Sequence, residues 1–117
     1  MDSRSRTILS TLILAATLGC LGPGQASSRN EEREAQSGKP TRIFNFFDCT
    51  SHIPWQGTAF VDHGTVTYKD VTQKRCGNPS EPAREVWYTS PPGFTGVDTV
   101  TFPFSGGAST IFTITVH

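Results

Sequence analysis

The stretch that decides the fold runs from Tyr88 to Phe104 and reads Y-T-S-P-P-G-F-T-G-V-D-T-V-T-F-P-F. Two prolines fix φ and remove amide donors, and Gly93 and Gly96 allow positive φ or a close backbone approach. These residue types predict a stiff corner between two strands. After the corner the apolar residues alternate, which indicates a β-strand with one buried face. They are Val100, Phe102 and Phe104.

Asp98 follows the second glycine of this corner. A short carboxylate there can accept hydrogen bonds from loop amides and hold the corner closed, which leaves Phe94 to cover the end of the core. The alternative is a calcium site, but a hard cation needs about six or more oxygen ligands and the nearby aspartates are few and scattered. We therefore expect Gly93, Gly96 and Asp98 to be structural turn residues, and we expect no metal site.

Beyond Thr41 the sequence alternates with period two or breaks at glycine and proline, and no helical stripe is present. Many short strands with turns between them predict a β-sandwich or barrel. Pro103 interrupts one strand, so that strand must be a sheet edge there or carry a bulge. Strands are expected at 42–47, 58–61, 65–71, 84–89, 98–104 and 110–116. The expected core comprises Phe44, Phe46, Val66, Tyr68, Phe94, Phe112, Ile114, Val116 and either Val86 or Trp87.

The motif P-G-F-x-G-x-D-x-V-x-F occupies Pro92–Phe102, with H-G-T-V at His63–Val66 before it and a closing strand at Ile111–Val116 after it. This set resembles the bacterial cadherin-like, immunoglobulin-like repeat of large surface proteins, over residues 63–116. The repeats usually occur in tandem, whereas this chain has room for one copy and carries a cysteine pair and a long insert. The resemblance implies a small immunoglobulin-like (cadherin-like) β-sandwich of about six or seven strands in an extracytoplasmic setting.

Residues 1–26 have the pattern of a secretory signal peptide. Arg4 and Arg6 precede the uncharged apolar run 8–21, which is shorter than the ~20 residues that a membrane span needs. Cleavage after Ala26 fits the preference for small residues, and no transmembrane segment is then expected to remain. Lipid anchoring through Cys20 is the alternative. The expected location is the periplasm or the exterior of the cell.

Residues 27–41 are almost free of apolar side chains. Such a segment cannot bury enough surface to offset its ordering entropy, so we expect a flexible polar tail, with at most a frayed helical turn at 31–36. The folded domain is then expected to span residues 42–117.

Cys49 and Cys76 are the thiols that remain after export. An oxidising compartment favours a disulfide between them, worth about 3 to 4 kcal/mol for a loop of this length. A thiol nucleophile or a metal ligand near His52 is the alternative, but no second ligand pair supports a zinc site. We expect the disulfide, because so small a domain needs reinforcement.

Two places can carry a binding surface. The polar insert Val71–Pro82 is expected to be an irregular surface loop, tethered through its cysteine, with a small positive spot at Lys74 and Arg75. Trp55, in a proline-containing connection, can be an exposed aromatic anchor for a sugar or protein, or it can close the core beside the disulfide.

No catalytic motif is present, and His63 beside Gly64 has the pattern of a turn residue. The formal net charge is zero and the basic residues are dispersed, which argues against nucleic acid. We expect an exported, non-catalytic binding or structural module at the bacterial envelope, monomeric and without a cofactor, whose partner is an envelope protein or glycan. The alternative is a secreted protease inhibitor on the same scaffold.

Overall fold

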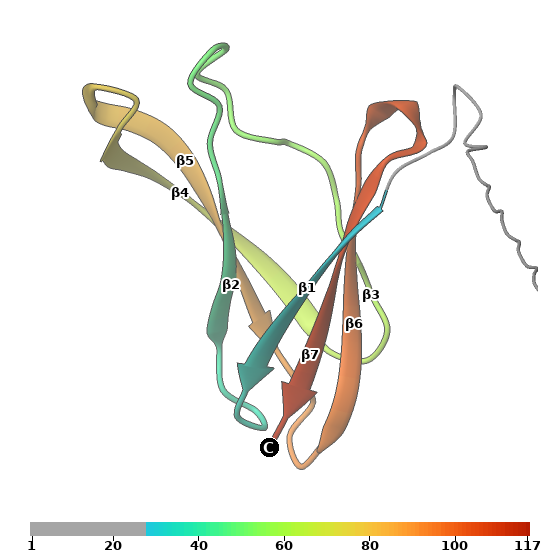
Figure 1. Ribbon diagram of the computed structural model, residues 1–117. Coiled ribbons are helices and arrows are strands. Elements are labelled where there is room, and N and C mark those ends of the chain that lie inside the picture. The colour runs from blue at the N-terminus through green and yellow to red at the C-terminus, as the bar shows by residue number, and fades with distance from the viewer. Residues whose placement is uncertain (1–27) are drawn as a thin grey trace, which may run out of the picture.

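The computed structural model of the protein describes residues 28–117 (Figure 1). The expected signal peptide, including Cys20, lies outside the described residues. Seven strands form two sheets, with the strand orders β1-β7-β6-β3 and β2-β5-β4. The strands are β1 (Ser28–Ala35), β2 (Thr41–Phe46), β3 (Phe60–Val61), β4 (Thr65–Arg75), β5 (Asn78–Thr89), β6 (Gly96–Pro103) and β7 (Ser109–Val116), and the short 3₁₀ turn η2 is Ser105–Gly107.

The strand order is that of an immunoglobulin-like sandwich. Strands β2, β5 and β4 take the places of strands B, E and D, and β3, β6 and β7 take those of C, F and G. The first strand differs, because β1 runs parallel to β7, from the pair Ser28 and Ser109 to the pair Ala35 and Val116. The all-β, immunoglobulin-like fold expected from the sequence is confirmed.

The prediction of a flexible tail at residues 27–41 is wrong for Ser28–Ala35, because these residues form the strand β1. Ala35 is the one buried side chain of this strand. The main-chain hydrogen bonds to β7 therefore hold this strand in place. Such hydrogen bonds do not depend on the polarity of the side chains. The pairing continues past the strand, where the His117 amide donates to the Ala35 carbonyl at 2.9 Å. The folded domain thus begins well before residue 42.

Aromatic rings fill the space between the two sheets. The Phe102 ring lies 5.3 Å from the Phe46 ring and 5.4 Å from the Phe112 ring, with edge-on geometry in both pairs. Val86, and not Trp87, faces this core, which decides the alternative left open by the sequence. The fully buried apolar residues include Val86, Tyr88, Val100, Phe102, Phe112 and Ile114.

The insert expected as an irregular loop at Val71–Pro82 is instead the outer half of the β4–β5 hairpin. Cys76 and Gly77 form its two-residue turn with φ of 58° and 69°, as a type I′ turn requires. The prolines of this segment are compatible with a strand because β5 pairs with β2 only as far as Arg84. Beyond that point one side of β5 has no β2 ladder to interrupt.

Pro103 is the last residue of β6 and lies opposite Ser109 of β7 without a register shift. On its other side β6 pairs with β3 only at Val100 and Thr101. Pro103 therefore occupies an edge position, so the bulge offered as the alternative is not needed.

The expected disulfide between Cys49 and Cys76 is confirmed, with the two Cα atoms 5.4 Å apart. It ties the β2–β3 connection to the tip of the β4–β5 hairpin. Figure 1 shows these two segments and the β6–β7 turn at one end of the sandwich, and the β5–β6 corner and the C-terminus at the other. The disulfide thus reinforces the end at which three connections meet.

Candidate functional site

The structure does not bring the predicted binding residues onto one surface. Trp55 is half-buried, with its ring 4.9 Å from Phe46 and 5.5 Å from Phe102, so it closes the core. Lys74 and Arg75 are both exposed on the hairpin. Arg75 lines a cavity of about 310 Å³, and Lys74 is not among the residues that line it.

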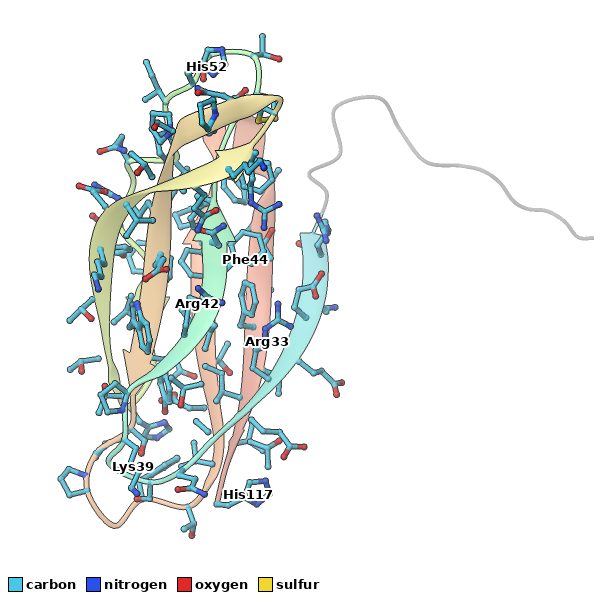
Figure 2. All side chains as sticks on the ribbon, turned by 90° about the vertical axis from the view of Figure 1, so that its left-hand side faces the viewer. Arg33, Lys39, Arg42, Phe44, His52 and His117 are labelled. Atoms are coloured by element: carbon cyan, nitrogen blue, oxygen red, sulfur yellow. A yellow bond between two sulfur atoms is a disulfide. The ribbon has the colours of Figure 1, made fainter. Side chains whose placement is uncertain are left out.

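That cavity is one of two that adjoin along the side of the sandwich between the edge strands β1 and β2. Their volumes are about 370 and 310 Å³, and Phe44, Asn45 and Phe47 line both. We call the combined depression the arginine–phenylalanine groove. Its rings are Phe44, Phe46, Phe47 and Phe104, and its cations are Arg29, Arg33, Arg42 and Arg75. Figure 2 shows Arg33, Arg42 and Phe44 on this side of the molecule.

The groove exists because of the way the first strand pairs. β1 joins β7, so the outer edge of β2 has no neighbouring strand among the described residues. A register shift between Arg42 and Phe44 also bulges β2, and a bulge bends and twists its strand. Ile43 is consequently buried, while the next residue, Phe44, is half-buried with its ring 5.3 Å from Phe112.

Arg33 bridges the two edge strands. Its Nε donates to the Ile43 carbonyl at 2.9 Å, and its guanidinium carbon lies 4.9 Å from the centre of the Phe112 ring. A second guanidinium nitrogen donates to the Glu32 carbonyl at 2.8 Å. Arg33 thereby occupies a hydrogen-bonding group on the open edge of β2 and fixes the width of the groove at mid-height.

Arg75 and Phe47 form the opposite wall. The Arg75 guanidinium carbon lies 4.4 Å from the centre of the Phe47 ring, and Nε donates to Oε1 of Gln73 at 3.0 Å. Phe47 remains 38% exposed, so its ring is available to a ligand. No ion pair within residues 28–117 involves Arg75, whereas Arg42 pairs with Glu85 at 3.0 Å.

Asp98 is the most heavily hydrogen-bonded carboxylate among the described residues, at 1% exposure. It accepts hydrogen bonds from the amides of His63, Gly64 and Thr99 at 2.8 to 3.0 Å, and from the Tyr88 hydroxyl at 2.6 Å. Burial would raise the pKa of Asp98, but these hydrogen bonds outweigh it and lower the pKa below its ordinary value. Burial and the same carboxylate raise the pKa of Tyr88, which stays protonated.

The expectation that Asp98 closes its own corner is therefore corrected. Asp98 holds the distant turn at His63 and Gly64, and the corner is closed by the Phe94 amide, which donates to the Pro91 carbonyl at 3.1 Å. The corner glycines, Gly93 and Gly96, have φ of 82° and 122°, in the region that favours glycine.

His52 and His63 each lie beside a buried carboxylate that already accepts other hydrogen bonds. The His52 Nδ1 lies 2.8 Å from Glu81, whose side chain is fully buried and also accepts from Asn78. The His63 Nδ1 lies 3.1 Å from Asp98, and the His63 ring stacks on Phe94 at 4.9 Å. Within residues 28–117 no hydroxyl or thiol hydrogen-bonds to either ring, and no group of three potential metal ligands was found.

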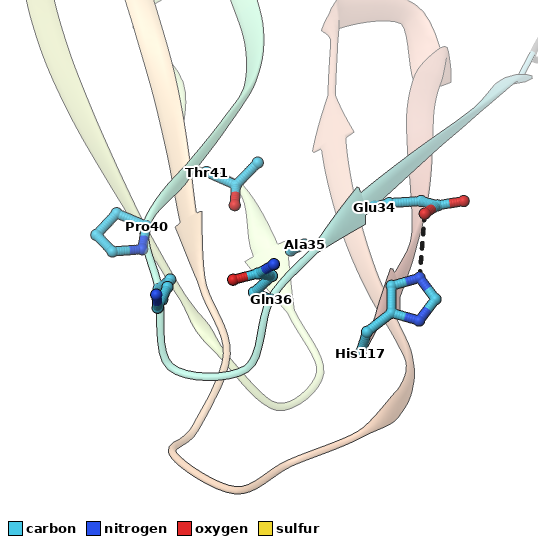
Figure 3. Close-up of a pocket in the computed structure, with 7 residues that line it drawn as sticks. Glu34, Ala35, Gln36, Pro40, Thr41 and His117 are labelled. Carbon is cyan, nitrogen blue, oxygen red and sulfur yellow. Dashed lines mark hydrogen bonds and ion pairs between the residues drawn. The ribbon is translucent and has the colours of Figure 1, made fainter.

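A third cavity, of about 400 Å³, lies at the other end of the molecule beside the β1–β2 turn (Figure 3). The His117 Nε2 lies 3.0 Å from Glu34, and both side chains are more than half exposed. An exposed pair of this kind contributes little, and its two groups largely satisfy each other. We therefore take the arginine–phenylalanine groove as the candidate site.

Sequence reasoning found Arg75 but missed Arg29, Arg33 and Phe47. A signal for two of them exists, because Arg29 and Arg33 are an even number of residues apart and share one face once their segment is a strand. In a flexible tail, by contrast, this spacing would place the two arginines on no common face.

A scan of family models, a search of curated proteins and a search of solved structures each found no match to this chain. No helix in residues 28–117 is long and apolar enough to cross a membrane. Fold and site thus define the described residues by class, as one disulfide-bonded, immunoglobulin-like β-sandwich with a cationic aromatic groove along its open side.

Proposed function

We propose that this protein is an exported, non-catalytic immunoglobulin-like module that binds a partner at the bacterial cell envelope. Export is supported by the N-terminal pattern of two arginines followed by the uncharged run 8–21. The disulfide between Cys49 and Cys76 is compatible with it, since such bonds persist in oxidising compartments. The resemblance of residues 63–116 to bacterial cadherin-like repeats supports the same setting.

The observation that carries the proposal is the arginine–phenylalanine groove. Aromatic residues and arginine are the side chains most enriched in the energetic centres of protein interfaces. Here Phe47 is partly exposed beneath Arg75, and Phe44 lies beside it in the same depression. The cation above the ring restrains both side chains before a partner arrives, which lowers the entropic cost of binding.

The non-catalytic part of the proposal has a separate support. Asp98 and Glu81, the carboxylates that lie beside His63 and His52, are buried and already accept several hydrogen bonds. A carboxylate in such a position holds a turn in place, and its lowered pKa, in the case of Asp98, makes it a poor proton carrier near neutral pH.

Site-specific photocrosslinking tests the proposal. A photoreactive phenylalanine analogue replaces Phe47 in the mature chain, which is then irradiated in an envelope extract. The matched control places the analogue at Phe60, which is 66% exposed on β3 at the opposite edge of the sheet that contains β1. A discrete crosslinked species from Phe47 and none from Phe60 is expected. Equal crosslinking at the two positions, or none at Phe47, contradicts the proposal.

One observation favours protease inhibition as a second candidate. The loop Asp48–Ile53 is anchored by the disulfide, and Asp48 accepts hydrogen bonds from the amides of Thr50 and Ser51. These bonds lower the pKa of Asp48. Ile53 projects from the loop at 63% exposure, as an inhibitory side chain would.

A panel of proteases tests this candidate by stoichiometric inhibition. Ile53→Asp should abolish inhibition, while Val97→Asp, at a similarly exposed apolar residue on β6, should leave it unchanged. Absence of inhibition across the panel, or equal loss in both variants, rejects the candidate.

A further inference from the structure

We infer that the arginine–phenylalanine groove binds an extended, acidic segment of a partner protein. The inference rests on the proposed function and adds the chemical class and conformation of the ligand.

The charge of the groove is the first argument. Four arginines line the two cavities, and two glutamates beside them, Glu31 and Glu85, form ion pairs with three of the four. The arginines therefore exceed these carboxylates by two charges. The whole chain carries equal numbers of basic and acidic residues, ten of each, so this local excess is not a property of the overall composition. A ligand that complements the groove must therefore carry carboxylates or another anionic group.

The arginines differ in how far they are already neutralised. Glu31 pairs with Arg29 at 2.8 Å and with Arg33 at 3.6 Å, and Arg42 pairs with Glu85 at 3.0 Å. Arg75 has only an amide oxygen as its hydrogen-bond partner within residues 28–117, and its position over Phe47 restrains it. A ligand carboxylate at Arg75 gains a charge-assisted hydrogen bond without displacing an internal carboxylate. Arg75 is therefore the residue at which an acidic ligand gains most.

The shape of the groove indicates an extended chain. It lies between two strand edges, and the outer edge of β2 has no strand partner in the described structure, although Arg33 occupies the Ile43 carbonyl on that edge. An extended peptide can use such an edge for main-chain hydrogen bonds, while its side chains alternate between the two sides. Apolar side chains then meet the rings of Phe44 and Phe47, and acidic ones meet the arginines. An anionic glycan would use the arginines but not the strand edge.

Two fluorescent decapeptides provide the test, one alternating glutamate with leucine and the other alternating lysine with leucine. The mature chain should bind the acidic peptide, and the lysine peptide should bind at least about tenfold more weakly. The decisive comparison is Arg75→Glu against Lys74→Glu, because these neighbours carry the same charge and only Arg75 lines the groove. Arg75→Glu should weaken binding about tenfold or more, as expected for loss of a charged hydrogen bond, and Lys74→Glu less than about twofold.

Arg75→Gln and Lys74→Gln form a milder second pair, and the unfolding midpoint of each variant shows that the fold is kept. Equal weakening by the two substitutions of a pair, or equal binding of the two peptides, overturns the inference. So does binding of a sulfated glycosaminoglycan fragment by a chain that does not bind the acidic peptide. A crosslink from Phe47 without peptide binding removes the inference but leaves the proposed function standing, whereas absence of that crosslink removes the proposed function.

Discussion

Replacement of Asp98 by alanine should destabilise the fold more than any other loss of a single carboxylate among the described residues. The substitution removes the acceptor for the Tyr88 hydroxyl and for the amides of His63, Gly64 and Thr99. Tyr88 is fully buried and has no other hydrogen-bond acceptor among the described residues. Its hydroxyl would be left without a partner.

The magnitude follows from these contacts. A buried donor left unpaired costs about 1 to 3 kcal/mol, and hydrogen bonds to a charged group contribute about 1.5 to 3 kcal/mol each. The two turn amides, beside the half-exposed His63 side chain, can regain water, so they cost about 1 kcal/mol each. The Tyr88 hydroxyl and the two turn amides together give an expected loss of at least about 3 to 5 kcal/mol, to which the Thr99 amide adds, out of the ~5 to 15 kcal/mol that a small domain has.

Urea unfolding followed by tryptophan fluorescence measures this loss. The matched control is Asp70→Ala, because the Asp70 carboxylate is 74% exposed and paired with Arg84 at 3.1 Å. Exposed pairs contribute at most about 1 kcal/mol, so the control should lose little. If the Asp98→Ala variant does not fold, Asp98→Asn serves in its place, because it keeps the shape of the side chain and removes its charge. Equal losses at positions 98 and 70, or a loss below about 1 kcal/mol at 98, would refute the reasoning.

The difference in stability between wild type and Asp98→Asn should also depend on pH. The pKa of Asp98 is lowered in the folded state, so its charge stabilises the fold above the unfolded pKa of about 3.9. This contribution is lost as the pH falls below that value and through the folded pKa. The difference between wild type and Asp98→Asn should be constant at neutral pH and should narrow below about pH 4.

Three further changes test the packing. Replacing Cys49 and Cys76 together by serine should cost about 3.5 kcal/mol, since the bond closes a loop with a sequence separation of 27; an unchanged urea midpoint would contradict this. Gly64→Ala should cost about 1 to 3 kcal/mol, because a Cβ there would clash with the backbone carbonyl oxygen of Thr89 and would lie 2.7 Å from Cε1 of Tyr88; a melting temperature equal to wild type would contradict it. Trp55→Ala should cost about 3 kcal/mol by calorimetry, and a loss below about 1 kcal/mol would place the ring outside the core.

The sequence was informative wherever a strand has one buried face. Alternation over Phe112, Ile114 and Val116 predicted the inward face of the last strand, and Val66 and Tyr68 predicted that of β4. Burial of apolar side chains leaves this period-two trace in the residues themselves. The disulfide could also be predicted from the sequence. Two cysteines follow the expected signal peptide, and an oxidising compartment favours a bond between them.

The sequence was uninformative where backbone pairing alone holds a strand. β1 and the outer hairpin at 71–82 carry mostly polar side chains, and their ladders to neighbouring strands leave no hydrophobic period. The groove could not be predicted from the sequence either, because it depends on how the strands pair. Arg29 and Arg33 in β1 face Phe44 and Phe47 near β2 only because β1 crosses to the other sheet and pairs with β7.

Amide chemical-shift mapping tests the central claim most directly. The mature, isotope-labelled chain is titrated with the alternating glutamate–leucine peptide, and the shift of each backbone amide is followed. The account predicts that the largest changes occur at Phe44, Phe47 and Arg75, on the groove between β1 and β2. Changes centred on Phe60 and Val97, at exposed positions on β3 and β6, or changes spread evenly over the surface would contradict it.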